Sequence, residues 1–220
     1  MGFKRYKTLK YDVIIVGAGP AGIFSALEMV GKTDLRILML DKGPDLERRK
    51  CPASRGFGCV NCEPCGLLCG WGGAGAFSDG KLTISTEVGG WLNQYVSEKE
   101  LKELINYVDS VYIKFGAPNR VYGEDIEKVE EIEKKASMAG LKLVHQKIRH
   151  MGTERCAQTL RRMRQELNGK VDIKMGKDVK GLIVKSGAVE GVETVEGEKF
   201  FGKYVIVAPG RGGAEWLQTE

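Results

Sequence analysis

The feature that most constrains this chain is a glycine-rich turn between a short apolar run and an amphipathic segment. Residues 12–16 form a β-branched run, which predicts a strand buried on both faces. Gly17, Gly19 and Gly22 follow in the pattern G-x-G-x-x-G. The first glycine permits a tight turn, the second lets backbone approach a pyrophosphate, and the third lets the next helix pack closely on the strand. The sequence therefore predicts a strand–turn–helix unit that binds a dinucleotide.

The residues around this turn supply the context that the motif requires. A helix predicted over about 21–30 would direct its free N–H groups and positive dipole end at phosphates. A second strand, over 36–40, ends at Asp41, whose carboxylate can accept hydrogen bonds from a ribose diol. The same charge argues against NADP, because the 2′-phosphate would meet it. The motif leaves FAD and NAD open, and a glycine turn without a ligand is the alternative to both.

Two later segments separate these possibilities through a resemblance. The segment 205–213 (VIVAPGRGG) reads as a buried strand ending in a glycine turn, and 70–82 (GWGGAGAFSDGKL) is a second glycine-rich segment. Together with 17–22 (GAGPAG) and the cysteines of 59–65, they resemble the FAD-dependent dehydrogenase family, among flavoprotein oxidoreductases of the glutathione-reductase type. The resemblance covers nearly the whole chain. It implies an α/β fold: a Rossmann-like FAD/NAD(P)-binding domain with a β-meander and an inserted, mainly helical segment.

The motifs and the resemblance together define a cofactor-binding set. The ADP half of FAD is expected on the first glycine turn, and the isoalloxazine near the second glycine segment and the turn at 209–210. Ser78 can hydrogen-bond the flavin, and Lys81, a catalytic candidate, can place positive charge near its N1 side. An ordinary turn with a surface lysine is the alternative. The FAD-binding residues predicted are Gly17, Gly19, Pro20, Ala21, Gly22, Asp41, Lys42, Gly72, Gly73, Ala74, Gly75, Ser78, Lys81, Ala208, Pro209 and Gly210.

A cluster of cysteines carries a second possible chemistry. Cys59, Cys62, Cys65 and Cys69 follow the spacing C-x2-C-x2-C-x3-C, and Cys51 lies upstream. This is the cysteine spacing of a bacterial ferredoxin run, without its following proline. The first three thiolates, with Cys51 or Cys69 as the fourth ligand, can hold a 4Fe-4S cluster. Cys62 and Cys65 can instead form a redox-active dithiol, which makes them catalytic candidates. Structural zinc and free thiols are the remaining alternatives.

Composition and charge narrow the class of protein. Six cysteines without an apolar secretory signal in residues 1–10 indicate a reducing compartment, so we expect a cytoplasmic protein. The 42% of hydrophobic residues suffice for a core, but no apolar run approaches a membrane span. The net charge of +5 is spread along the chain without a recognised nucleic-acid module, which favours a solvated surface over nucleic-acid binding. The partner expected is a small-molecule substrate or a redox protein.

The predicted FAD domain is discontinuous: residues 1–90 and 171–220 form it, and 91–170 are inserted. Helices are predicted over about 97–111, 124–139 and 153–167, with a strand over 141–148. Apolar residues at helical spacing in this insertion are interpreted as core packing. His145 and His150 are general-acid candidates for which a structural role is favoured. Four strands are predicted after the insertion, over 171–175, 179–185, 189–195 and 200–207.

These observations predict an oxidoreductase that transfers hydride or electrons through FAD. The alternatives are an NAD-dependent dehydrogenase domain and a non-catalytic nucleotide- or metal-binding redox module. The resemblance adds a further expectation, because members of the family are longer and close the flavin site with a late segment of glycine and acidic residues. No equivalent segment is found here, so we expect a truncated chain or a partner that supplies the rest, and a remnant without activity is a further alternative.

Overall fold

The structure is a computed structural model that describes residues 10–220; the basic lead-in of residues 1–9 lies outside the described part. The chain forms two compact units. Residues 10–76 and 160–220 make the first, which we call the sheet unit, and Phe77–Thr159 make the second, which we call the insertion unit. The insertion unit therefore begins and ends earlier in the chain than the predicted 91–170 segment.

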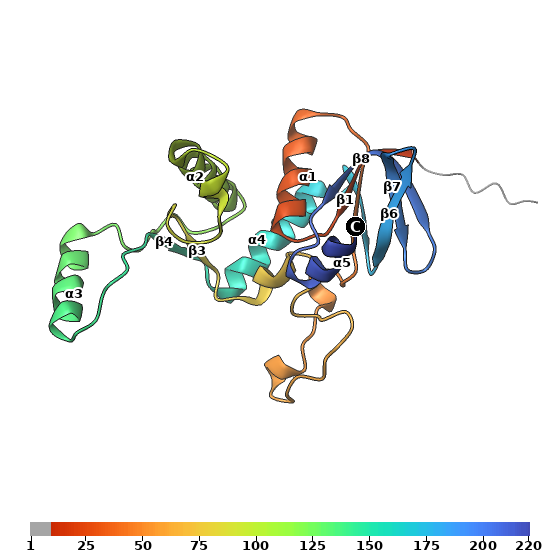
Figure 1. Cartoon of the computed structure of the whole chain (residues 1–220). Helices are drawn as coiled ribbons and strands as arrows, with labels where there is room; N and C mark the ends of the chain where they lie inside the picture. The colour runs from red at the N-terminus through yellow and green to blue at the C-terminus, as the bar shows by residue number, and fades with distance from the viewer. Residues whose placement is uncertain (1–9) are drawn as a thin grey trace, which may run out of the picture. The chain divides into compact units, whose positions relative to one another are not determined.

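The sheet unit is built on six strands in the order β5-β2-β1-β8-β7-β6. β1 pairs in parallel with β2 and with β8, and β2 pairs in parallel with β5. β6, β7 and β8 are antiparallel and form the meander on the right of Figure 1. This arrangement confirms the predicted α/β fold class. The strands are β1 (Lys10–Val16), β2 (Ile37–Asp41), β5 (Val171–Met175), β6 (Val179–Lys185), β7 (Ala188–Thr194) and β8 (Lys199–Val207).

Strand β1 is buried on both faces, as its β-branched run predicts. Ile14 and Ile15 are both fully buried although their side chains point to opposite faces. Ile14 belongs to a cluster with Leu38 of β2 and Val192 of β7. Ile15 lies on the other face, where its Cγ2 atom would be 3.2 Å from a Cβ placed on Gly22 of helix α1. The sheet therefore holds β1 at its centre with packing on either side.

Helices and short 3-10 turns complete the sheet unit. α1 (Pro20–Lys32) follows the glycine turn, and α5 (Ala214–Thr219) ends the chain. α4 (Gly152–Leu167) begins in the insertion unit and ends in the sheet unit. It buries Cys156, Leu160, Met163 and Leu167 at helical spacing, which confirms for this helix the core packing predicted from its apolar spacing. The 3-10 turns are η1 (Leu46–Arg48), η2 (Ala53–Arg55), η3 (Gly73–Phe77, which crosses into the insertion unit) and η5 (Arg211–Gly213).

The insertion unit is mainly helical. α2 (Glu98–Lys114) begins at Ser97, whose side chain accepts a hydrogen bond from the Glu100 N–H at 3.2 Å, as the capping sequence predicts. β3 (Lys81–Thr83) and β4 (Ile148–His150) form a short antiparallel pair. The remaining elements are η4 (Leu92–Gln94) and α3 (Ile126–Met138).

Two predictions for this unit are wrong. The strand expected over 141–148 is reduced to β4, because residues 141–147 have no strand partner and Leu141 and Val144 are each 66% exposed. Helix α3 exists, but its apolar face is not packed: Ile126 is 54% exposed, Ile132 is 53% exposed and no α3 residue is buried. The apolar pattern predicts the helix and not what covers it. Among residues 10–220, no helix combines the length and apolar character needed to cross a bilayer.

Candidate dinucleotide-binding site

The glycine turn after β1 is shaped by contacts that exclude side chains. A Cβ on Gly17 would lie 2.0 Å from the Ala208 carbonyl oxygen, and the residue has a φ of +111°. A Cβ on Gly22 would lie 2.0 Å from the Gly17 carbonyl oxygen, which is the close helix–strand packing that the motif predicts. Gly19 differs, because its φ is −78° and a Cβ would meet nothing closer than Gly73 Cα at 3.8 Å. The space beside Gly19 is therefore open.

The N-terminus of α1 lies at this open space. Pro20 is its first residue and Gly19 its N-cap, and the first turn contains no acidic residue. The first N–H groups of a helix have no partner within it, and the helix dipole adds partial positive charge there. The N–H groups of Ala21 and Gly22 are therefore available to an anionic group at this position.

The second glycine segment lies directly against the first turn. The Gly72 N–H donates to the Ala18 carbonyl oxygen at 2.8 Å. A Cβ on Gly73 would lie 3.0 Å from Gly19 Cα and 3.2 Å from Pro20 Cδ. Ala74 and Gly75 are exposed, and a Cβ on Gly75 would have nothing within 4 Å. Backbone from two distant segments thus forms one surface over the start of α1.

Asp41 connects these segments. Its carboxylate accepts three backbone hydrogen bonds, from Ala18 at 2.8 Å, Gly43 at 2.7 Å and Gly70 at 2.8 Å. A carboxylate offers about four acceptor positions, so roughly one remains for a ligand hydroxyl. Asp41 therefore orders the site in addition to the ribose contact that the motif predicts for it, a contact that stays a prediction.

A cavity of about 320 Å³ opens beside Asp41 at the carboxyl ends of β1 and β2. Ligands of open α/β sheets bind at this edge. Lys42 and Pro209, both predicted cofactor contacts, line it. Lys42 Nζ also donates to the Gly212 carbonyl oxygen at 3.1 Å. The other lining residues are Val16, Gly17, Leu40, Lys177, Asp178, Val179, Lys180, Val195, Gly213 and Trp216.

The strand β8 brings the third predicted segment to the same edge. The Ala208 N–H donates to the Val16 carbonyl oxygen at 2.8 Å and so extends the β1–β8 ladder. Gly210 then turns the chain with a φ of +64° towards η5. The turn at Ala208–Gly210 and the first glycine turn are therefore neighbours across parallel strands.

Sequence reasoning missed Arg49, which organises the second glycine segment from within. The side chain is 5% exposed, and its guanidinium donates to four carbonyl oxygens. Those of Gly66 and Leu67 lie at 3.0 and 2.6 Å, and those of Trp71 and Gly73 at 2.7 and 2.8 Å. Nothing in the basic run around Arg49 distinguishes this residue from its exposed neighbour Arg48.

Burial of Arg49 carries an electrostatic consequence. Desolvation lowers the pKa of the guanidinium, while the negative charge of Asp41 opposes this shift, as do Cys69 and Cys65. An arginine remains protonated in proteins even so, and the site therefore contains a fixed positive charge under its glycine backbone.

The cysteines belong to a loop that extends away from the sheet, drawn in orange in Figure 1. Cys59 and Cys62 are exposed, Cys51 and Cys65 are half-buried, and Cys69 is buried. Burial raises the pKa of the Cys69 thiol, and Lys42 opposes the shift. Within residues 10–220, no three Cys, His, Asp or Glu side chains converge as metal ligands. The thiols in this arrangement do not fit an iron–sulfur cluster.

The remaining candidates lie in the insertion unit. Lys81 Nζ forms an ion pair with Asp79 at 2.9 Å, and the Ser78 hydroxyl donates to Asp79 at 3.4 Å. His145 Nε2 lies 2.6 Å from the Gly123 carbonyl oxygen, and His150 Nε2 lies 3.1 Å from that of Asp79. Both histidines thus hydrogen-bond backbone, which agrees with the structural role favoured for them. The flavin contacts expected of Ser78 and Lys81 stay predictions.

Comparisons with known proteins bear on the fold alone. No family model matches the chain. An uncharacterised protein of Clostridium beijerinckii is 39% identical over 77 residues, which are 34% of this chain and 14% of that protein. A point mutant of NikD, an amino acid oxidase essential for nikkomycin biosynthesis, superposes with a TM-score of 0.50 at 14% identity. The superposition covers 96% of this chain and 54% of NikD.

PqsL of Pseudomonas aeruginosa, a probable FAD-dependent monooxygenase, gives a TM-score of 0.43 at 12% identity, over 90% of this chain and 42% of PqsL. The chain thus spans about half the length of the solved structures it matches. At this level of identity the NikD comparison shows the fold alone, an α/β sheet protein with a Rossmann-like core.

Proposed function

We propose that the sheet unit binds FAD and that the chain is the flavin-binding part of an FAD-dependent oxidoreductase, of the glutathione-reductase structural type. The observation that carries the proposal is the meeting of two glycine segments over the N-terminus of α1, where Gly72 donates to Ala18 and Gly73 faces Gly19. A backbone-lined surface at a helix N-terminus is suited to a pyrophosphate.

The residues present fit the ADP half of FAD. The space beside Gly19 is one that a Cβ would enter, so a side chain there would compete with a bound phosphate. The first N–H groups of α1 would donate to the pyrophosphate. Asp41 retains acceptor capacity for a ribose hydroxyl, and the 320 Å³ cavity beside it can receive the adenosine.

The protein supplies position and electrostatics, and FAD, when bound, supplies the hydride- or electron-transfer chemistry. Arg49 holds the second glycine segment against the first and keeps a positive charge beneath it. Lys42 lines the cavity beside Asp41. Ser78 and Lys81 are proposed to contact the flavin ring, and the exposed Cys62 and half-buried Cys65 to form the dithiol alternative.

Gly19→Ala tests the proposal sharply. Gly19 has a backbone conformation open to any residue, and an added methyl would make only an ordinary contact at 3.8 Å, so we expect the free energy of unfolding to fall by no more than about 1 kcal/mol, the cost of alanine at an N-cap. The methyl would enter the phosphate space, so FAD affinity should fall about tenfold or more. Gly31→Ala is the matched control: it lies in the same helix with nothing within 4 Å of its Cβ, and should leave FAD affinity unchanged.

Isothermal titration of the purified chain with FAD, NAD⁺ and ADP gives the readout. Tight binding of FAD, lost in Gly19→Ala and retained in Gly31→Ala, would support the proposal. Preference for NAD⁺ would replace it with the NAD-dependent dehydrogenase alternative. Equal loss in both variants would contradict the assignment of the site to the glycine turn, and FAD binding without reduction by any donor would favour a non-catalytic module.

A further inference from the structure

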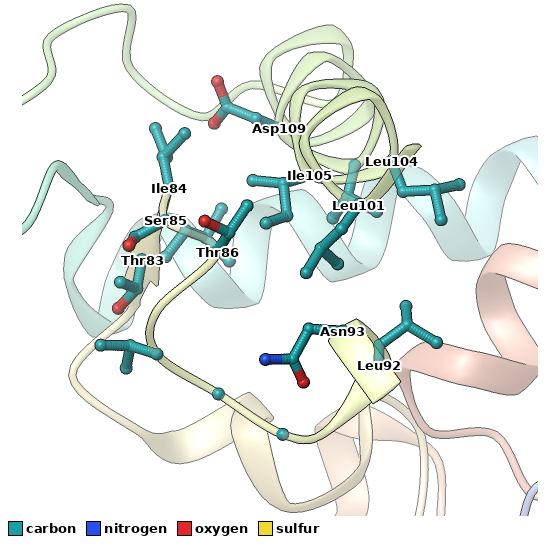
Figure 2. Close-up of a pocket in the computed structure, with 15 residues that line it drawn as sticks. Thr83, Ile84, Ser85, Thr86, Leu92, Asn93, Leu101, Leu104, Ile105 and Asp109 are labelled. Carbon is teal, nitrogen blue, oxygen red and sulfur yellow. The ribbon is translucent and has the colours of Figure 1, made fainter. Parts of the chain in front are cut away.

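A second cavity lies within the insertion unit, and the proposed flavin function does not use it. Its volume is about 400 Å³, within the range of small-molecule sites. Figure 2 shows that the segment from β3 to η4 curves around one side and that α2 forms the other. The lining comprises Leu82, Thr83, Ile84, Ser85, Thr86, Val88, Gly89, Gly90, Leu92, Asn93, Leu101, Leu104, Ile105, Val108 and Asp109.

Aliphatic side chains of α2 supply the apolar wall. Leu101 is 8% exposed and therefore packs, but Leu104 is 42% exposed and Val108 is 37% exposed. Ile105 extends from α2 into the cavity in Figure 2. The exposed aliphatic face of α2 forms one wall of the cavity, and the curved segment from β3 to η4 forms the opposite wall. The surface is therefore concave, which favours a small ligand over a protein partner.

Polar side chains are also present among the lining residues: Thr83, Ser85, Thr86 and Asn93. The Asn93 side-chain amide extends from η4 between the loop and α2 (Figure 2). Asn93 is exposed, so its amide is open to solvent and accessible to a ligand. An amide carries both donors and an acceptor, so it can bind a hydroxyl or a carbonyl group of a ligand.

The lining contains no uncompensated charge. Asp109 is its one ionisable residue, and Arg149 holds both carboxylate oxygens, with Nε on Oδ1 at 2.5 Å and Nη2 on Oδ2 at 2.7 Å. The Arg149 side chain is 5% exposed, so this ion pair is largely withdrawn from solvent. A charged ligand would lose its hydration in the cavity without gaining a partner of opposite charge.

Two glycines let the loop turn around the cavity. Gly89 and Gly90 have φ values of +100° and +99°, and a Cβ on either would have nothing within 4 Å. Their positive φ lets the chain between Val88 and η4 turn around the cavity. No side chain projects from these two positions to obstruct it.

We propose that this cavity is a binding site for an uncharged organic molecule of bicyclic size that carries a hydroxyl or carbonyl group at one end. The rings pack against Ile105 and the aliphatic wall, and the oxygen hydrogen-bonds the Asn93 amide. The site is independent of the flavin proposal, since binding is measured without FAD.

The probe is 2-naphthol, followed in ¹H–¹⁵N spectra of the full chain. We expect shift changes confined to the lining residues, with a dissociation constant on the order of 0.1–1 mM for a molecule of this size. Ile105→Trp fills the cavity and should weaken binding about tenfold or more. Glu103→Trp is the matched control, because that side chain is on the same helix and 68% exposed, and it should bind as the wild type does.

Asn93→Leu keeps the fold testable if Ile105→Trp does not fold. It should weaken 2-naphthol about threefold to tenfold, the range of one hydrogen bond, and leave 2-methylnaphthalene within about twofold. Shift changes spread over other residues, or undiminished binding to a folded Ile105→Trp, would overturn the proposal. If Asn93→Leu weakened the binding of 2-naphthol and 2-methylnaphthalene equally, the proposed hydrogen bond to Asn93 would be contradicted.

Discussion

The candidate sites of the two units differ in what lines them. The surface over the N-terminus of α1 is lined largely by backbone, because Gly19 and Gly73 place no side chain there. The cavity of the insertion unit is lined mainly by aliphatic side chains, with the polar side chains of Thr83, Ser85, Thr86 and Asn93 among them. A backbone-lined site requires glycine residues, so the sequence alone can indicate it. A side-chain-lined cavity uses the same residues as an ordinary core, so only the fold reveals it.

Removal of the Arg49 side chain should have the largest effect on stability. It tests whether the backbone of the second glycine segment keeps its conformation without this buried donor. Arg49→Met would leave four carbonyl oxygens without their donor in a buried place. We expect the free energy of unfolding to fall by about 3 kcal/mol or more. Arg48→Met is the control: that side chain is exposed, and a change within about 0.5 kcal/mol is expected. Urea denaturation at pH 7 measures both variants. Equal stabilities of Arg49→Met and Arg48→Met would show that the second glycine segment does not depend on the Arg49 side chain.

Alanine substitutions in α2 sharpen the contrast between packing and lining. Leu101 is 8% exposed and Leu104 is 42% exposed, one helical turn apart. Leu101→Ala should lower the free energy of unfolding by about 2–3 kcal/mol, and Leu104→Ala by less than about 1 kcal/mol. The same denaturation experiment distinguishes them. If Leu104→Ala were as destabilising as Leu101→Ala, the cavity wall would be core, and the proposed ligand site would lose its apolar surface.

The rates at which the cysteine thiols are alkylated compare their burial in the two units. Burial raises the pKa of Cys69 in the sheet unit and of Cys156 in the insertion unit. Both should be alkylated at least about tenfold more slowly than the exposed Cys59 and Cys62 at pH 8. Because the thiolate is the reactive form and the pKa of both thiols is raised, their alkylation rates should still be rising with pH at pH 9.

Pulsed labelling with iodoacetamide, read by mass spectrometry, assigns each cysteine separately. Cys156→Ser is the control that identifies the signal of the buried thiol in the insertion unit. Fast labelling of Cys69 at neutral pH would mean that the second glycine segment opens, and that the two units do not protect their thiols alike.

The smallest effect concerns a surface charge at the edge of the sheet unit. Hydrogen bonds from Arg36, with a further contribution from Lys203, lower the pKa of Asp12 from 3.8 to about 2. A carboxyl with a lowered pKa stabilises the folded state above pH 3.8, and this contribution is lost as the pH falls from about 4 to about 2. Asp12→Asn should therefore flatten the acid limb of the stability curve slightly.

The acid unfolding curve followed by circular dichroism between pH 2 and 7 measures this. Asp34→Asn is the matched control, since Asp34 is exposed and forms no ion pair within the described residues, 10–220. An acid limb unchanged by Asp12→Asn would mean that solvent screens the pair completely.

Local patterns predicted the regular elements of the sheet unit well. Strands over 171–175 and 179–185 are found with those bounds as β5 and β6, and the helix expected over 21–30 is α1. Period, β-branching and glycine position act over a few residues, so they survive without knowledge of the fold. The insertion unit was harder: apolar spacing gave α2 and α3 correctly as helices, but predicted buried faces that the structure leaves exposed.

The sequence by itself determined the strand–glycine–helix unit and its acidic residue, because tight turns and close backbone contacts admit only certain residue types. Tertiary structure alone decided that Asp41 accepts three amides, that Arg49 rather than Arg48 is buried, and that α2 lines a cavity. These features depend on which segments, distant along the chain, pack together. An arginine or a leucine has the same local preferences in a core, at a cavity wall or on a surface, and its neighbours in space assign its role.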